Sequence, residues 1–311
     1  MSQRTRSVAH DGRRFEVVSY GEGPPVVLLH ELHGVSTAFH ELACMLQLQG
    51  YSVHVPLLYG DSEVRSTLGG AVKAWSCLRR EMALFSAGGP DKLTNWLNAL
   101  IAELVADPEL DASRGVAVIG MCMTGGIVLG TLANESTATV ISSQPSSPMR
   151  PWSPTTSADL GLSDETLEAA EESDTPLLCL RYRNDPLCGD GRFDHIRTRL
   201  KSTDEEHPLG EWQRRGHLRV FTHGRLTTVE VPGSRHSVLT SDRDPEALAL
   251  TVEWLAKHLL DPGPEPGSDV ARWGNPLLLG AAAALAGWAV GRWLGARTPP
   301  VRPSRTDDGN A

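Results

Sequence analysis

Residues 115–126 of the 311-residue chain read GVAVIGMCMTGG, and this stretch decides the fold that the sequence predicts. Its first half is a continuous apolar run, which is typical of a strand buried in the middle of a parallel sheet. An apolar segment of helical length follows the last two glycines, so the chain is expected to pass from strand to helix through a tight turn. Cys122 stands at the apex of that turn. Strand, glycine-flanked turn with a nucleophilic side chain, and helix together form a nucleophile elbow.

On both sides of this turn, apolar runs of strand length alternate with amphipathic segments of helix length, from about residue 12 to residue 260. The alternation predicts an α/β fold, a doubly wound and mostly parallel sheet with helices on both faces. Residues 57–89 give no clear pattern. Strands are expected at residues 15–20, 25–30, 51–56, 115–120, 138–142, 176–182 and 227–231, and helices at residues 36–49, 91–106, 163–173 and 244–259.

The chain carries 29 Lys and Arg against 38 Asp and Glu, a formal charge of −9. An acidic chain is repelled by phosphate backbones, and no basic stretch is longer than the arginine cluster within residues 4–14, so nucleic-acid partners are not expected. Five scattered cysteines argue against a disulfide framework and favour a reducing compartment. The N-terminus lacks the apolar core of a secretory signal, so the main domain, residues 1–260, is expected in the cytoplasm.

The composition changes after residue 260. Residues 261–272 are rich in Pro and Gly and are predicted to be a linker. Residues 273–295 are expected to form a hydrophobic helix with an uncharged run close to the length that spans a bilayer, and residues 296–311 a disordered tail. Membrane association through this helix is therefore expected. Its Ala-rich composition leaves open that it lies in the membrane interface or packs on the domain.

Three glycines of this helix, Gly287, Gly291 and Gly295, recur at four-residue spacing. Such a small-residue face lets two helices approach closely, so a homodimer is a possible state of the chain. The arginines after the helix favour a cytoplasmic tail, yet no N-terminal signal would carry the main domain outside, so the orientation stays open.

Cys122 would lie at the N-terminus of the predicted helix, where the helix dipole and free N–H groups favour a thiolate. The usual elbow is G-x-nucleophile-x-G, and here Thr124 replaces the second glycine, with two glycines directly after it. A buried, inert cysteine is the alternative. A soft-metal site with Met121 and Met123 is not expected, because consecutive side chains on such a turn do not converge on one ion.

A thiol nucleophile needs a base and a group that orients the base. In doubly wound hydrolases these follow the nucleophile in the order acid, then His. Asp185 follows the expected strand at 176–182 and His236 follows the one at 227–231, which places both where ligands meet open α/β sheets. Each residue also has an alternative interpretation without a catalytic role, since an Asp before Pro often forms a turn and a lone His often lies on the surface. The rival acids and bases are Asp190, Asp194, His217 and His223.

Residues 30–34, which follow an expected strand, read HELHG. This is not the zinc-protease motif HExxH, because Gly34 occupies the position of the second His. No metal or organic cofactor is expected. Glu31 is expected to face the nucleophile, where a buried carboxylate beside a thiol either has a raised pKa or holds the thiol neutral.

Five segments together resemble the dienelactone hydrolase family, cysteine hydrolases with the α/β-hydrolase fold. They are residues 30–34 (HELHG), 120–126 (GMCMTGG), 143–146 (SQPS), 184–187 (NDPL) and 236–240 (HSVLT). The resemblance covers about residues 12–260 and leaves out the C-terminal tail. It implies hydrolysis of a carboxylic ester or lactone through an acyl-thioester intermediate.

By this resemblance Cys122 is the nucleophile, His236 the base and Asp185 the residue that orients the base. Glu31 would hold Cys122 in its resting thiol state and help deprotonate it when substrate displaces the carboxylate.

The resemblance also implies that the backbone N–H groups of Met123 and Leu32 form the oxyanion hole. Family members that open dienelactones bind the substrate carboxylate with arginines, one of them a few residues beyond the catalytic His. Residues 239–241 read LTS here, which argues against a carboxylated lactone. Two other functions stay open: a thioesterase, and a tethered hydrolase-like domain that binds a partner or senses oxidants through Cys122 without turnover.

Overall fold

The structure is a computed structural model that describes residues 3–58, 89–148, 158–201 and 210–260. The chain divides into two units, Met1–Pro264 and Glu265–Ala311, and every described residue belongs to the first unit.

The expectations for the C-terminal segments, the linker at 261–272, the hydrophobic helix at 273–295 and the tail at 296–311, lie outside the described residues. Among the helices that the structure does describe, none combines the length and the apolar character needed to cross a membrane.

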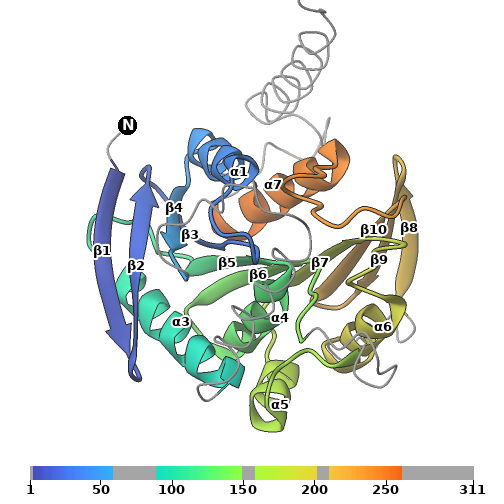
Figure 1. Ribbon diagram of the computed structural model, residues 1–311, viewed down its shortest axis with the longest axis horizontal. Coiled ribbons are helices and arrows are strands. Elements are labelled where there is room, and N and C mark those ends of the chain that lie inside the picture. Colours follow the sequence, from blue (N-terminus) through green and yellow to red (C-terminus); the bar gives the residue numbers. More distant parts are fainter. Residues whose placement is uncertain (1–2, 59–88, 149–157, 202–209, 261–311) are drawn as a thin grey trace, which may run out of the picture. The chain divides into compact units, whose positions relative to one another are not determined.

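The strands of the described chain form one ten-stranded sheet (Figure 1). They are β1 (Gln3–His10), β2 (Arg13–Tyr20), β3 (Pro25–Leu29), β4 (Ser52–Pro56), β5 (Val116–Met121), β6 (Thr137–Ser143), β7 (Leu177–Tyr182), β8 (Glu211–Arg215), β9 (Leu218–His223) and β10 (Leu226–Val231). Their order is β1-β2-β4-β3-β5-β6-β7-β10-β9-β8. The six strands from β4 to β10 in this order are parallel, and the pairs at both edges are antiparallel. The predicted doubly wound, mostly parallel sheet is confirmed.

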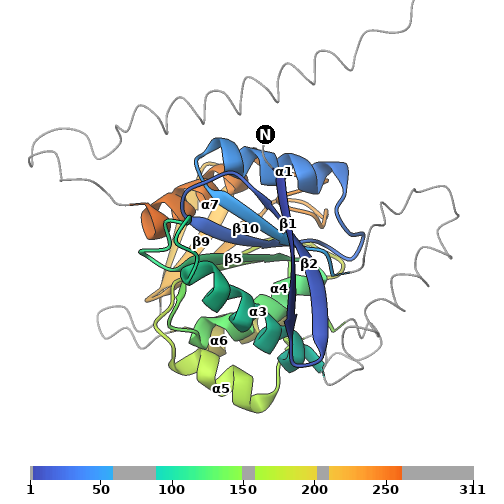
Figure 2. The ribbon, with the colours of Figure 1, turned by 90° about the vertical axis from the view of Figure 1, so that its left-hand side faces the viewer.

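Helices cover both faces of the sheet (Figures 1 and 2). On one face lie α1 (Thr37–Leu48) and α7 (Pro245–Leu259); on the other lie α3 (Gly89–Val105), α4 (Met123–Ile127), the short 3-10 helix η1 (Val128–Ala133), α5 (Asp164–Glu172) and α6 (Asp190–Arg199). Each face has its own apolar core. Strands β3 and β5 lie between the two cores and are buried along their whole length, which explains their continuous apolar sequence.

Three helices are capped by a polar residue, and each of these residues is the first residue of the helix predicted from the sequence. The side chains of Ser36, Ser163 and Asp244 accept hydrogen bonds from backbone N–H groups in the first turns of α1, α5 and α7. These caps satisfy donors that a helix leaves unpaired at its N-terminus.

The antiparallel edges of the sheet were not predicted. Strands β8 and β9, and β1 ahead of the expected first strand, have no continuous apolar run of strand length, and all five residues of β8 are exposed. Because edge strands of this kind bury few side chains, they lack the apolar run by which the central strands were recognised.

A buried histidine joins the N-terminal hairpin to the parallel strands. His54 on β4 lies opposite Ser19 on β2, with its Nδ1 2.8 Å from Oγ of Ser19 and its Nε2 3.1 Å from Oγ of Ser52. Burial, helped by the charge of Arg6, lowers the pKa of His54 to about 3. The imidazole is therefore neutral in the folded protein at ordinary pH.

Acidification should reduce the free energy of unfolding through His54. The unfolded chain takes up this proton near pH ~6.5, whereas the folded chain takes it up only near pH 3, so stability falls as the pH drops through this window, by up to ~1.4 kcal/mol per pH unit. Urea unfolding at a series of pH values, compared with His54→Gln, measures the effect. Equal pH slopes for the two proteins would contradict it.

Candidate active site

Cys122 lies at a sharp turn between β5 and α4. Its φ of +57° is in the left-handed region, which is rare for a residue other than glycine. Backbone hydrogen bonds hold the turn to the end of β6: the N–H of Cys122 donates to the carbonyl of Ser143, and the N–H of Ser146 donates to the carbonyl of Cys122, both at 3.0 Å. The expected strand, turn and helix are present.

Glycines around Cys122 are required by close backbone approach. A Cβ on Gly120 would lie 2.5 Å from the carbonyl oxygen of Thr124, and one on Gly125 would lie 2.9 Å from that of Ser143. Thr124, which replaces the second glycine of the usual pattern, instead accepts a hydrogen bond from the N–H of Met121 at 2.9 Å. The contact with β6 therefore falls at Gly125, one position later than in the usual elbow.

The thiol of Cys122 contacts Ser146. Its Sγ lies 3.1 Å from Oγ of Ser146, a buried residue on the loop after β6. In the sequence, Ser146 stands out only as part of the segment 143–146 that resembles the family. Its position beside Cys122 could have been predicted, because the carboxyl ends of neighbouring parallel strands lie side by side and β6 is the neighbour of β5.

His236 and Asp185 come together as the sequence analysis expected. They follow β10 and β7, which are parallel neighbours, and Nδ1 of His236 lies 2.8 Å from Oδ2 and 2.9 Å from Oδ1 of Asp185. The other ring nitrogen, Nε2, is buried and has no hydrogen-bond partner among the described residues. Burial lowers the pKa of His236, but the hydrogen bond with Asp185 and the nearby side chain of Cys122 outweigh burial and raise it to about 10.

Asp185 is held by its own loop. Its carboxylate is fully buried, and Oδ1 accepts hydrogen bonds from the N–H groups of Leu187 at 2.8 Å and Cys188 at 3.1 Å. Arg181 on β7 closes the loop by donating to the carbonyl of Cys188 at 3.1 Å. The position of the Arg181 side chain therefore helps to fix the orientation of the Asp185 carboxylate.

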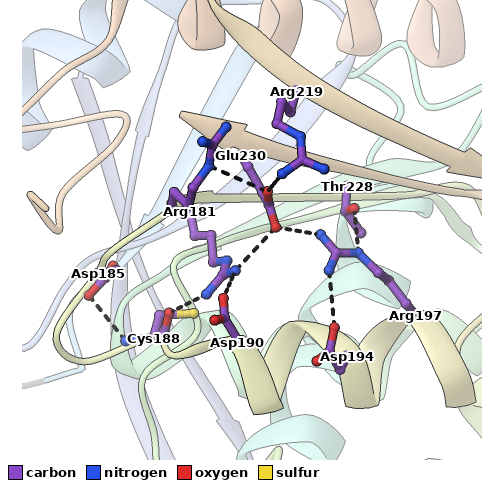
Figure 3. Close-up of polar contacts among 10 residues, drawn as sticks. Arg181, Asp185, Cys188, Asp190, Asp194, Arg197, Arg219, Thr228 and Glu230 are labelled. Carbon is purple, nitrogen blue, oxygen red and sulfur yellow. Dashed lines mark hydrogen bonds and ion pairs between the residues drawn. The ribbon is translucent and has the colours of Figure 1, made fainter. Parts of the chain in front are cut away.

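Arg181 belongs to a buried charge cluster behind that loop (Figure 3). Its side chain is 1% exposed and pairs with Asp190 and, at 3.1 Å, with Glu230 on β10. Burial would raise the pKa of Glu230, but hydrogen bonds from Arg197 and Arg181 hold it below its ordinary value. Two more arginines lie near the same carboxylate, Arg219 at 3.5 Å and Arg183 at 3.9 Å.

The rival acids and bases have other partners. Asp190 and Asp194 pair with arginines of this cluster. His217 lies 2.8 Å from Asp244 at the start of α7, and His223 is buried on the antiparallel strand β9. The hydrogen bond to Asp185 distinguishes His236 from both.

Glu31 lies in the loop after β3, but its described hydrogen bonds are not with Cys122. Its Oε1 accepts from the side-chain amide of Gln144 at 2.9 Å and from the hydroxyl of Thr240 at 3.0 Å. The carboxylate thus ties together the loops that follow β3, β6 and β10. This differs from the expectation that Glu31 holds the thiol directly, since the hydroxyl beside the sulfur is that of Ser146.

The sequence profile of the dienelactone hydrolase family matches residues 14–258. The chain belongs to the dienelactone hydrolase family. It is therefore a hydrolase, as the resemblance of its five segments predicted.

Solved structures show how widely the fold of this dienelactone hydrolase family member is shared. A putative dienelactone hydrolase from Klebsiella pneumoniae is 14% identical, with a TM-score of 0.57 over 83% of this chain and 98% of that one. The esterase Pf2001 from Pyrococcus furiosus is 11% identical, with a TM-score of 0.56 over 83% and 91%. Est1E from Butyrivibrio proteoclasticus is 10% identical, with a TM-score of 0.52 over 83% and 99%. A search of curated proteins finds no match.

The residues expected to form the oxyanion hole lie on adjoining segments of this hydrolase. Met123 is the first residue of α4, and Leu32 is buried in the loop after β3. The hydroxyl of Thr124 lies 3.0 Å from the carbonyl oxygen of Met121 and 3.4 Å from that of His30, so it contacts both segments. The described part of the chain holds no group of three or more His, Cys, Asp or Glu residues suited to a metal ion.

Replacing Glu230 with Ala should lower the free energy of unfolding by about 3 kcal/mol, because it leaves the buried charge of Arg181 with less compensation. Chemical unfolding of Glu230→Ala measures this loss. Glu172→Ala, which removes an exposed carboxylate at the end of α5, is the matched control and should change stability little. Equal losses in the two variants would show that the cluster is not a stabilising element.

Proposed function

We propose that the protein hydrolyses a carboxylic ester or lactone through Cys122, His236 and Asp185, with an acyl-thioester intermediate. The observation that carries this proposal is the hydrogen-bonded pair of His236 and Asp185. The other ring nitrogen of His236, Nε2, is buried near the thiol and has no hydrogen-bond partner within the described part of the chain. A nucleophile beside a base that a third group orients is the arrangement required for covalent catalysis.

The steps follow from these positions. The thiol proton of Cys122 passes to Nε2 of His236, and the hydrogen bond between Nδ1 and Asp185 stabilises the imidazolium that forms. The thiolate attacks the carbonyl carbon, a sulfur–carbon bond forms, and the charge moves to the carbonyl oxygen, beside the N–H groups of Met123 and Leu32. As the tetrahedral adduct collapses, the carbon–oxygen bond to the leaving group breaks and the alcohol takes the proton from His236.

The acyl-thioester then reacts with water. His236 accepts a proton from the attacking water molecule and passes it to the sulfur as the carbon–sulfur bond breaks, so that the carboxylic acid leaves and the thiol is restored. Asp185 keeps the imidazole in one orientation through both halves of the reaction.

Glu31 supports this arrangement without a bond to the sulfur. By holding Gln144 and Thr240 it fixes the loops on which Leu32 and His236 are carried. We therefore expect partial loss of activity from Glu31→Gln, and much larger loss from changes at Cys122 or His236.

Cys122→Ala should abolish hydrolysis, because no other described thiol lies at the elbow, and His236→Ala should slow it by ~10²–10⁴-fold, the usual contribution of a positioned base. Turnover of a panel of aryl esters, lactones and acyl thioesters by the full-length protein measures both.

Cys44→Ala and His217→Ala are the matched controls, since each removes the same chemical group outside the proposed site, and both should keep wild-type rates. Undiminished turnover in Cys122→Ala would rule out the proposed nucleophile. A best rate on acyl thioesters would identify the protein as a thioesterase instead. Ready alkylation of Cys122 without turnover of any member would favour a binding or oxidant-sensing role.

A further inference from the structure

The sulfur of the candidate nucleophile contacts a hydroxyl to which the sequence assigned no role. Oγ of Ser146 lies 3.1 Å from Sγ of Cys122, and Ser146 is 1% exposed. Among the described residues, its hydroxyl has no other hydrogen-bond partner that would compete for it. The sulfur is therefore the hydrogen-bond partner of this hydroxyl.

The position of Ser146 is fixed from two sides. Its own N–H donates to the carbonyl of Cys122, so the residue is tied to the turn that carries the sulfur. The buried guanidinium of Arg192 on α6 donates to the carbonyls of Pro145 at 2.8 Å and Pro148 at 3.2 Å, one on each side of Ser146. A hydroxyl held in this way needs little reorganisation to serve a charge that appears on the sulfur.

We propose that Ser146 is a further catalytic residue, whose hydroxyl donates a hydrogen bond to the Cys122 thiolate and stabilises it before attack. A thiolate has no proton, so in that state the hydroxyl must be the donor. Hydrogen bonds to an ionised acceptor are stronger than those to a neutral one, so the contact favours the thiolate over the thiol. This inference rests on the proposed function, because it assigns a partner to the proposed nucleophile.

The hydroxyl acts on one stage of the reaction only. It increases the fraction of Cys122 present as thiolate at neutral pH, and it loses its charged acceptor when the sulfur–carbon bond forms and the charge moves to the carbonyl oxygen. A stabilised thiolate is also intrinsically somewhat less nucleophilic. Removing the hydroxyl should therefore slow reaction where the thiol is mostly protonated, and leave unchanged or slightly raise the rate where it is fully ionised.

The test is the pH dependence of alkylation of Cys122 by iodoacetamide in the full-length protein, followed on the Cys122 peptide by mass spectrometry so that other cysteines do not contribute. In Ser146→Ala the acidic limb of the rate profile should shift to a pH about one unit higher. The alkylation rate should be about tenfold lower at pH values below this limb and should not fall at the alkaline plateau.

Ser147→Ala is the control, because it removes the neighbouring hydroxyl of the same buried loop and keeps that of Ser146, and its acidic limb should coincide with that of the wild type. An unmoved limb in Ser146→Ala, or the same movement in both variants, would overturn the proposal. Thermal unfolding checks that each variant is folded, and Ser146→Gly provides a second variant without the hydroxyl. Because alkylation needs no substrate, the result stands whether or not an ester is hydrolysed.

Discussion

The turn at Cys122 is the constraint on which the rest of the site depends. A residue with a side chain is held there at a φ of +57°, a conformation that costs of the order of 1–3 kcal/mol and persists only when its surroundings determine it. Those surroundings are the two backbone hydrogen bonds to the loop after β6 and the glycines that let this loop approach. The turn places Cys122 at the carboxyl end of β5, directly before α4.

The other groups of the site lie at one edge of the sheet because the parallel strands all end there. Loops after β3, β6, β7 and β10 supply Glu31, Ser146, Asp185 and His236 in turn. Polar contacts hold each of these loops. The carboxylate of Glu31 joins the loops after β3, β6 and β10, and Arg181, which pairs with Glu230, holds the loop after β7. The buried charges of the domain thus serve to fix the loops as much as to stabilise the fold.

Much of this arrangement could be predicted from the sequence, because it follows from local patterns. The apolar runs of β3 and β5 mark strands covered on both faces, the capping residues mark helix starts, and chain order placed Asp185 and His236 at the ends of two strands that prove to be neighbours. The edge strands β1, β8 and β9 escaped prediction because their side chains are largely exposed.

Contacts that depend on side-chain direction could not be predicted either. Glu31 contacts Gln144 and Thr240, which lie more than a hundred positions away in the sequence, and the sulfur of Cys122 contacts Ser146, 24 positions away. These contacts form only in the folded chain, so no local sequence pattern indicates them. Likewise, the need for glycine at position 125 rather than 124 depends on where the end of β6 touches the turn.

The most direct test of this account is to trap the intermediate. The full-length protein is mixed with an aryl ester, quenched in acid during the first turnovers and digested, and the peptides are examined by mass spectrometry. The account predicts one acyl group on Cys122, released by hydroxylamine. An acyl group on Ser146, or steady ester hydrolysis without any acylated Cys122, would contradict it.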